Sequence, residues 1–396
     1  MKFNKAIFAL TFICLVTCYL GLSWGEQFQK IKVGAVRPYF AGPPSPYPVG
    51  SRDRAAVWQD SVVSPGAEFI RVHFTAFHLQ DGDYVTVSSV DGAQFWTYTG
   101  KGLHGRGDFW SFAVDGDTAM VTLHAGLNPG HGYRIDKVGH GTKKSEPTQE
   151  VVCGTDGRED IACHTNVAGI NNAQMTVARL QFVQGASLYL CTGWLVAGSN
   201  NSTMLTNNHC FSSQSGVDTV QARFNYQRTT CGGSTDATAT NYAGGTFLKT
   251  NTVNKKGNKG GLDYTLFTLQ GNPEATWGEI TATTQAAAIG DLIYFIQHPG
   301  GRRKEIGYWE DEAQTARCNV DAVNQTYSRS AAGSQTAYGC DSEGGSSGSP
   351  IISATTYRAV ALHHFGGVSS NPCLNSGTQM SKICTDASSL LSCASN

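Results

Sequence analysis

Three short motifs in the second half of the chain supply the residue types needed for nucleophilic attack on a carbonyl group. His209 follows an Asn-Asn pair, Asp263 begins an apolar run, and Ser347 lies in a Gly-Ser-Ser-Gly-Ser-Pro stretch. A serine hydroxyl is a weak nucleophile at neutral pH, so a histidine must accept its proton during attack. A buried aspartate holds that imidazole in the required tautomer and stabilises its charged form. We therefore expect a triad in which His209 is the base, Asp263 its partner and Ser347 the nucleophile.

Each motif also has a purely structural interpretation. The Gly/Ser stretch could be a flexible loop, a histidine before a cysteine is often structural, and an aspartate before an apolar run often opens a strand. The conjunction and order of the three motifs favour chemistry instead. Gly345 strengthens this interpretation, because its backbone N–H together with that of Ser347 can form an oxyanion hole for a tetrahedral intermediate.

With the order His, Asp, Ser, the chain resembles trypsin-like serine proteases of the chymotrypsin fold. Within them it resembles the bacterial lysyl-endopeptidase and glutamyl-endopeptidase branches, whose form of the segment after the nucleophile is Ser-Gly-Ser-Pro. The resemblance covers roughly Cys153 to Cys393. It implies an all-β fold of two packed barrels, with His209 and Asp263 on the first and Ser347 on the second. It also implies peptide or protein substrates and no cofactor.

One departure from trypsins concerns activation. Trypsins carry an aspartate immediately before the nucleophile, which receives a new N-terminus after cleavage, whereas this chain has Ser346. No Ile-Val-Gly-Gly stretch follows a basic residue upstream. Activation through that buried ion pair is therefore not expected.

Two groups of residues give conflicting indications about substrate preference. Asp341 lies six residues before Ser347, the spacing at which trypsin-like enzymes hold the carboxylate that pairs with Lys or Arg side chains, and Ser342 follows it. The downstream segment His364, Phe365 and Gly366 resembles the pocket wall of glutamyl endopeptidases, where a histidine accepts an acidic side chain. A carboxylate would repel glutamate, so both cannot serve one substrate. We favour cleavage after basic residues, with glutamate preference as the alternative.

The N-terminus and composition indicate a secreted protein. Lys2 and Lys5 precede an apolar stretch to about Leu22, and Ser23-Trp24-Gly25 offers small residues to a signal peptidase, so residues 1–25 are expected to be a signal peptide. An uncleaved membrane anchor is the alternative. The 29 Lys and Arg nearly balance the 30 Asp and Glu, which argues against a nucleic-acid surface or a polybasic membrane patch. We expect a monomer without stable membrane association.

The cysteines support an oxidising compartment. Ten of the 12 fall between Cys153 and Cys393, an even number consistent with five disulfides. Cys191 and Cys210 are expected to close the loop that carries His209. The resemblance to lysyl endopeptidases implies two further pairs, and elimination leaves the last two; these four are Cys153–Cys373, Cys163–Cys231, Cys318–Cys340 and Cys384–Cys393. No Cys-x-x-Cys pair occurs, so we expect no metal site.

The chain divides into two β-rich parts. Residues 26–137 are expected to form a small β-sandwich, CUB-like in one stretch, because alternating segments are separated by Asp-Gly turns. Residues 138–152 form a polar linker containing Lys143-Lys144, an accessible site for proteolysis. Residues 153–396 form the protease-like domain, in which short strand patterns recur without helical periodicity. The expected strands are 69–74, 83–87, 109–112, 119–123, 176–183, 188–196, 220–224, 263–269, 292–296 and 358–362.

These observations predict a secreted serine endopeptidase whose N-terminal part is a propeptide or an accessory binding domain. Two other functions remain open. One is a catalytically silent protease homologue that acts as a binding module, which the intact triad disfavours. The other is an esterase with the same triad, which the motif order and the cysteines disfavour because most triad esterases use Gly-x-Ser-x-Gly.

Overall fold

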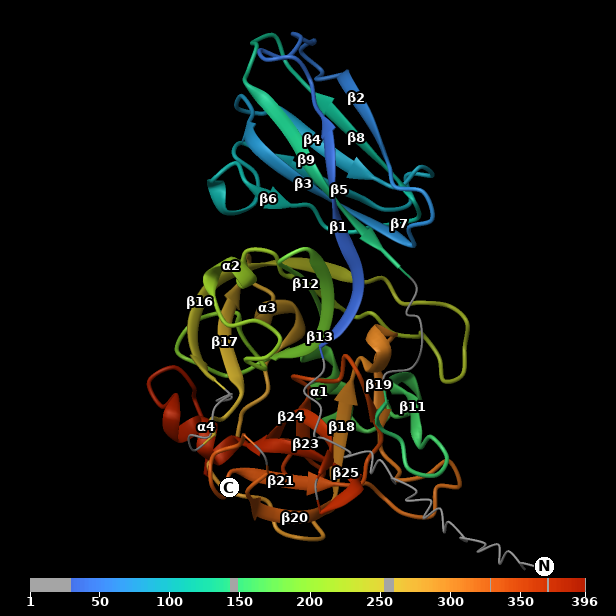
Figure 1. Ribbon diagram of the computed structural model, residues 1–396, viewed down its shortest axis with the longest axis vertical. Helices are drawn as coiled ribbons and strands as arrows, with labels where there is room; N and C mark the ends of the chain where they lie inside the picture. The colour runs from blue at the N-terminus through green and yellow to red at the C-terminus, as the bar shows by residue number, and fades with distance from the viewer. Residues whose placement is uncertain (1–29, 143–148, 253–259, 328, 369, 396) are drawn as a thin grey trace, which may run out of the picture.

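The computed structural model describes residues 30–142, 149–252, 260–327, 329–368 and 370–395. Strands dominate the fold, which confirms the expected all-β class. From residue 149 onward the chain forms two β-rich bodies, and a β-sandwich lies above them (Figure 1). The predicted signal peptide and Lys143-Lys144 lie outside the described residues. Among the helices in the described ranges, none is long and apolar enough to cross a membrane.

The first of these bodies is a closed six-stranded antiparallel barrel. Pairing between its first and last strands closes the cylinder, and a core that includes Phe182, Phe211 and Phe267 fills it. In spatial order the strands are β12 (Val177–Gln184), β15 (Gln221–Phe224), β16 (Thr240–Asn251), β17 (Tyr264–Leu269), β14 (Thr203–Thr206) and β13 (Ser187–Leu195).

The second body is an eight-stranded antiparallel sheet, to which a two-stranded ribbon is added at the linker. The ribbon joins β10 (Gln149–Val151) to β22 (Ser342–Glu343), just before the turn that carries Ser347. In spatial order the large sheet contains β11 (Arg158–Asp160), β19 (Glu305–Gly307), β18 (Ile293–Gln297), β23 (Pro350–Ser353), β24 (Ala359–Val368), β25 (Asn371–Gln379), β21 (Gln335–Tyr338) and β20 (Val320–Gln325).

The N-terminal part packs two layers around an aromatic core that includes Phe74, Phe77 and Phe109. One layer is the sheet β2 (Ala56–Val63), β8 (Thr118–His124), β4 (Tyr84–Ser88) and β5 (Phe95–Thr99). The other contains β1 (Ile31–Ala41), β9 (Gly132–Gly141), β3 (Phe69–His78), β6 (Phe109–Trp110) and β7 (Val114–Asp115). Two packed layers give the sandwich that the alternating sequence pattern predicts.

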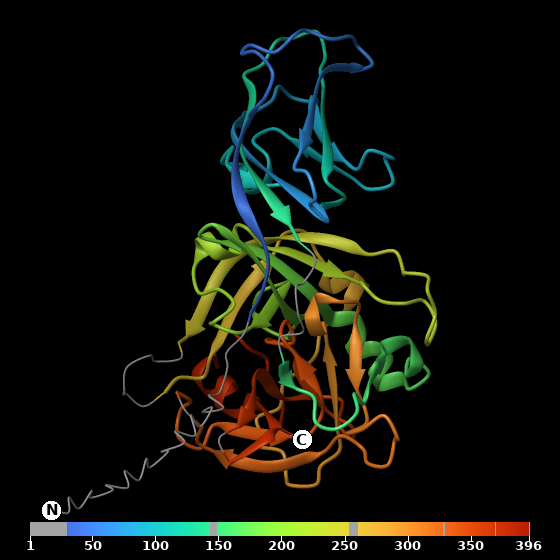
Figure 2. The same cartoon turned by 45° about the vertical axis from the view of Figure 1, so that its right-hand side comes forward.

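Two features were not expected from the sequence. The first is a set of short helices, α1 (Ala168–Thr176), α2 (Gln214–Val217), α3 (Glu274–Trp277) and α4 (Met380–Asp386), with 3₁₀ turns at Leu103–Gly105, Ile161–Cys163 and Pro299–Gly301. The longest has nine residues, too few for a clear helical period in the sequence. The second is β1, which pairs with β9 of the sandwich and with β13 of the barrel, so one continuous sheet joins the two parts (Figure 2).

Candidate active site

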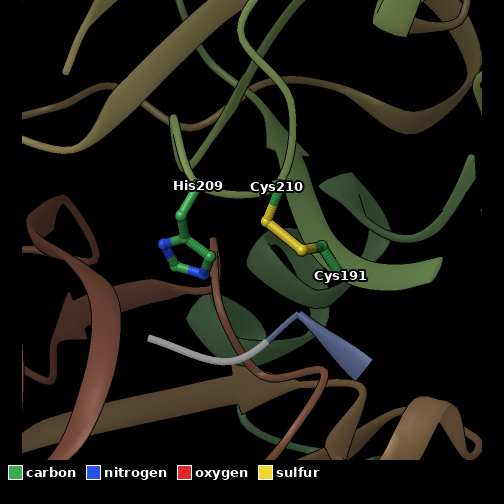
Figure 3. A group of neighbouring side chains, drawn as sticks. All are labelled: Cys191, His209 and Cys210. Atoms are coloured by element: carbon green, nitrogen blue, oxygen red, sulfur yellow. A yellow bond between two sulfur atoms is a disulfide. The ribbon is translucent and has the colours of Figure 1, made fainter. Parts of the chain in front are cut away.

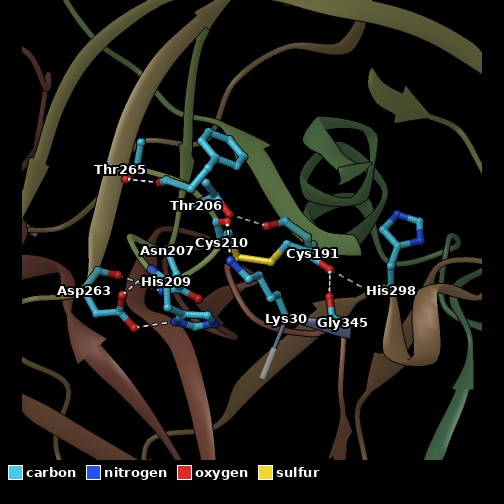
Figure 4. The surroundings of a disulfide bond; sticks show 12 residues. Lys30, Cys191, Thr206, Asn207, His209, Cys210, Asp263, Thr265, His298 and Gly345 are labelled. Atoms are coloured by element: carbon cyan, nitrogen blue, oxygen red, sulfur yellow. Dashed lines mark hydrogen bonds and ion pairs between the residues drawn. A yellow bond between two sulfur atoms is a disulfide. The ribbon is translucent and has the colours of Figure 1, made fainter. Parts of the chain in front are cut away.

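His209 and Asp263 come together at neighbouring strands of the first barrel. His209 lies in the loop after β14, and Asp263 immediately precedes β17, which pairs with β14. Asp263 accepts two hydrogen bonds from the histidine: Oδ2 from the ring Nδ1 at 2.7 Å and Oδ1 from the backbone N–H at 3.0 Å. The aspartate therefore fixes both the loop and the orientation of the imidazole (Figure 4).

Asp263 is a fully buried anion. Burial raises its pKa, but the charge of His209 and hydrogen bonds from His209 and His364 outweigh this and lower the pKa to about 2. Its φ of +49° is unusual for a non-glycine residue, and the side-chain amide of Asn207 donates to its carbonyl at 2.9 Å. These contacts keep Asp263 ionised and fixed throughout the pH range in which histidines titrate.

A disulfide between Cys191 and Cys210 ties the His209 loop to β13, with 6.4 Å between the Cα atoms. Figure 3 shows the imidazole of His209 beside this bond. The ligand-type atoms of the three residues lie within 4.8 Å of one another, a spacing that can suit a metal ion. Both sulfur atoms are used in the S–S bond, however, so neither is available as a thiolate ligand.

Ser347 lies, fully buried, on a tight turn between β22 and β23. Its carbonyl accepts a hydrogen bond from the backbone N–H of Thr192 at 2.9 Å. Thr192 follows Cys191, so this bond and the disulfide bring the serine turn and the His209 loop to the same end of β13. Gly348 must be glycine here, because a Cβ would lie 2.1 Å from the Thr192 carbonyl oxygen and its φ is +90°.

The backbone just before Ser347 is held by hydrogen bonds to Gly300 and to Thr192. The Gly344 carbonyl accepts from the N–H of Gly300 at 2.7 Å, and the Gly345 carbonyl accepts from the Thr192 hydroxyl at 2.9 Å. In a trans peptide the N–H points opposite to the preceding carbonyl, so the Gly345 N–H is directed away from Gly300. With φ at +100°, Gly345 adopts a backbone conformation that other residues avoid.

Asp341 is buried beside the start of the protease-like domain. Its carboxylate accepts hydrogen bonds from the backbone N–H groups of Cys153 at 3.2 Å and Gly157 at 2.7 Å. Burial raises its pKa to about 6 despite these bonds. The neighbouring Ser342 donates to the side-chain oxygen of Asn375 at 2.6 Å. Asp341 and Ser342 thus lie on one segment with Ser347 but have their own partners.

His364 lies against Asp263. Its Nδ1 is 3.3 Å from Asp263 Oδ2 and its Nε2 is 2.6 Å from Gln335 Oε1, and the ring is completely buried. Phe365 packs next to it in a small core with Tyr327 and Val368. Gly366 is paired with Asn375 on the adjacent strand β25. His364 therefore contacts the group that orients His209, a position that the sequence did not indicate.

Several polar residues of the site carry no sequence motif. Thr192 links the two bodies through Ser347, Gly345 and the backbone of His298. Gln297 accepts from the Ser346 hydroxyl at 2.5 Å and donates to the Asp341 carbonyl at 2.8 Å. Asn207, Gln335 and Asn375 support Asp263, His364 and Ser342. Isolated Thr, Gln and Asn residues give no signal without the fold, because their partners are distant in sequence.

Five disulfides occur among the described residues, and they are the five pairs expected from the sequence. Cys153–Cys373 anchors the start of the protease-like domain to β25. Cys163–Cys231 and Cys191–Cys210 brace the first body, and Cys318–Cys340 ends one residue before Asp341. Cys384–Cys393 closes a short C-terminal loop.

Comparison with known proteins identifies related sequences and folds. Residues 155–381 match the family "Lysyl endopeptidase, C-terminal domain". "Secreted RxLR effector protein 73" of Plasmopara viticola is 27% identical over 336 residues, covering 81% of this chain and 79% of that protein. "Lysyl endopeptidase" of Pseudomonas aeruginosa is 26% identical over 304 residues, covering 71% of this chain and 61% of that protein. A glutamyl endopeptidase structure aligns with a TM-score of 0.41 and 21% identity over 60% of this chain and 99% of its own.

The family match spans more than half of the chain and includes His209, Asp263 and Ser347. The chain therefore belongs to the lysyl endopeptidase family and is a serine endopeptidase.

Proposed function

We propose that this protein is a secreted serine endopeptidase that uses Ser347, His209 and Asp263 to form and hydrolyse an acyl-enzyme. The observation that carries the proposal is the buried His209–Asp263 pair, whose 2.7 Å hydrogen bond leaves the opposite ring nitrogen, Nε2, as the atom that exchanges a proton with the nucleophile. Secretion is supported by the N-terminal sequence, the five disulfides and a relative that is named as secreted.

The proposed reaction proceeds in two steps. The Ser347 hydroxyl attacks the scissile carbonyl as His209 takes its proton, and His209 then gives that proton to the leaving amine. A water molecule, deprotonated by the same histidine, cleaves the resulting ester and restores the serine. Throughout, Asp263 stabilises the charged imidazole, and the N–H groups of Gly345 and Ser347 stabilise the oxyanion.

Fluorophosphonate labelling of the secreted protein tests this proposal. These probes react with activated serine nucleophiles, so we expect one labelled site that disappears in Ser347→Ala. Ser349→Ala is a matched control: this serine is two residues away, and its buried hydroxyl has no hydrogen-bond partner among the described residues. Labelling that persists in Ser347→Ala would disprove the assignment of the nucleophile.

For substrate preference we propose cleavage after Lys or Arg, with Asp341 as the group that attracts the cationic side chain. Its burial supports this role, because an unmatched substrate would leave a desolvated carboxylate without a cation. Asp341 and His364 both have partners already, but those of Asp341 are neutral backbone N–H groups, whereas His364 lies 3.3 Å from a carboxylate oxygen of Asp263. Glutamate preference, the alternative, has less support, because Asp263 would repel a second carboxylate at His364. Profiling with a peptide library that varies the residue before the cut distinguishes the two, and acidic preference would refute the role of Asp341.

A catalytically silent binding module is the second candidate function. It is favoured by one observation, the similarity over 81% of the chain to a protein named as an effector. In that case residues 26–137 would carry the activity as an accessory domain, with residues 138–152 as a linker and residues 153–396 as an inactive scaffold. Absence of fluorophosphonate labelling, both before and after cleavage near Lys144, would support this function over proteolysis.

A further inference from the structure

Strand β1 fills an edge of the first barrel that would otherwise be open. Along Ser187–Leu190, β13 pairs with β12 on one side and with β1 on the other. The pairing with β1 is antiparallel and joins Ile31 to Leu190, Lys32 to Tyr189 and Ala35 to Ser187. An unpaired edge exposes backbone donors and acceptors that readily accept an extended peptide. The first residues of β1 therefore occupy a surface suited to peptide binding.

This pairing is reinforced by an apolar cluster. Ile31 and Val33 are buried together with Leu188, Leu190 and Trp110. The cluster contains residues from β1, from the sandwich and from the barrel, so it contributes to holding β1 on β13.

Polar contacts also bind the sandwich to the barrel. The buried Arg71 donates to the Thr219 carbonyl at 3.0 Å, and the side-chain oxygen of Gln221 accepts from the N–H of Ala113 at 2.9 Å. Arg106 also forms an ion pair with Asp218. None of these contacts depends on the linker, so cutting the linker leaves them intact.

The start of β1 lies at the active site. The Lys30 ammonium is 3.3 Å from the carbonyl oxygen of Cys210, the residue that follows His209 (Figure 4). A Cβ placed on Gly345 would lie 3.4 Å from Cγ2 of Ile31. The strand thus begins beside both the loop of the proposed base and the glycine of the proposed oxyanion hole.

The direction of β1 matches one half of a peptide substrate. Ile31 pairs next to Cys191, at the catalytic end of β13, whereas Ala35 pairs with Ser187 at the far end. The chain therefore runs away from the active site as residue numbers increase. The part of a substrate that follows the scissile bond also runs away from the catalytic serine in this direction, and this part leaves with the amine after acylation.

We propose that residues 30–35 of the chain itself occupy the surface on which an extended substrate would place its leaving-group half, namely the β13 edge at Ser187–Leu190 with Gly345 and Cys210 beside it. The inference rests on the proposed function of the site. If β1 occupies the β13 edge, it competes with extended substrates for that edge. Substrates with a small leaving group do not bind there and are not affected. Occupancy by β1 also means that a cut near Lys144 does not by itself free this surface.

Two substrates with the same acyl half test the proposal. One is a peptide nitroanilide, which has a small leaving group, and the other is an internally quenched peptide that continues six residues beyond the cut. The measured quantity is the ratio of kcat/KM for the long substrate to that for the short one. We expect it to rise at least ten-fold in the Ile31→Asp/Val33→Asp variant, because charges in the apolar cluster release the strand. Phe40→Asp is the control, since this residue lies on β1 beyond the β13 pairing and is 86% exposed.

A second variant tests the opposite change without weakening the fold. Lys32 and Tyr189 face each other across β1 and β13, so Lys32→Cys/Tyr189→Cys can form a disulfide that locks the strand in place. We expect the ratio of kcat/KM for the long substrate to that for the nitroanilide to be lower in the locked protein than in Lys32→Ala/Tyr189→Ala.

The outcomes separate this inference from the proposed function. If fluorophosphonate labels every variant equally and the rate ratio changes in neither the released nor the locked protein, the competition between β1 and substrate is refuted, while the proposed function stands. If no variant is labelled at Ser347, the proposed function fails and the inference fails with it.

Discussion

The two β-rich bodies of the protease-like domain each contain a fully buried aspartate, and the pKa of one is lowered while that of the other is raised. Asp263 of the first barrel faces two imidazoles, and its pKa falls to about 2. Asp341 of the second body accepts bonds from two backbone N–H groups, and its pKa rises to about 6. Both are removed from water, which favours the neutral form. The groups that face each carboxylate therefore decide whether its pKa falls or rises. The imidazoles beside Asp263 lower its pKa more than burial raises it, whereas the two backbone N–H groups beside Asp341 do not offset burial.

The two bodies also differ in what surrounds the aspartates: an apolar core in the first and a network of buried polar side chains in the second. The first barrel has an apolar core of aromatic and aliphatic side chains, and its proposed catalytic residues lie beside strand ends, His209 in the loop after β14 and Asp263 just before β17. Around the Ser347 turn the second body buries polar side chains that bond to one another, such as Ser346 to Gln297 and Ser342 to Asn375. Such networks fix geometry when every member is satisfied. The proposed base is thus held mainly by one ion pair and a disulfide, and the proposed nucleophile by a network.

The largest expected effect comes from the aspartate of the first barrel. Replacing Asp263 with Asn preserves the shape but removes the charge that stabilises the imidazolium, so kcat should fall on the order of 10⁴-fold. Asp341→Asn should leave kcat for an uncharged substrate within about five-fold, because this group does not contact His209 in our assignment. Steady-state kinetics on one peptide amide measures both variants. Similar losses of kcat in Asp263→Asn and Asp341→Asn would contradict the assignment of Asp263 to catalysis and Asp341 to substrate preference.

An intermediate effect is expected where the two bodies meet. The Thr192 hydroxyl donates to the Gly345 carbonyl and accepts from the His298 N–H. Thr192→Val removes both bonds at nearly constant volume, and the unfolding free energy should fall by about 2 kcal/mol because two buried backbone groups lose a partner.

Urea denaturation measures the change, and Thr192→Ser, which retains the hydroxyl, should be within about 1 kcal/mol of the parent protein. A Thr192→Val protein as stable as Thr192→Ser would show that the hydroxyl does not connect the bodies.

The smallest expected effect is a pH dependence of selectivity. Since the pKa of Asp341 is raised to about 6, its carboxylate is charged above this pH and becomes neutral as pH falls below it. The ratio of kcat/KM for a Lys substrate to that for a Met substrate should therefore drop about ten-fold between pH 7 and pH 5, as the ionised fraction falls. Taking the ratio cancels the protonation of His209, which affects both substrates equally. A constant ratio would exclude Asp341 as the selective group.

The candidate catalytic motifs could be proposed from sequence because the chemistry of a triad needs specific residues in a specific order. The strands could also be predicted, since alternating apolar residues mark Phe69–His78 and Val177–Gln184 directly. Strand β1 was missed, although its buried residues Ile31 and Val33 alternate with Lys32, because its two partners lie about 100 and 160 residues further along the chain. The position of His364 was missed for a similar reason: the sequence suggested a pocket wall, and only the packing of β24 against the Asp263 loop brings its ring to the carboxylate.

The sequence by itself determined the all-β class and the family and supplied the candidate catalytic residues, because strand periodicity and reactive residue types are local properties of the chain. The tertiary structure alone decided the charge states of Asp263 and Asp341, the contacts of Thr192 and His364, and the union of the sandwich with the barrel through β1. Each of these depends on which residues, distant in sequence, are buried next to one another, because burial and the nearest partners set both pKa values and hydrogen bonding.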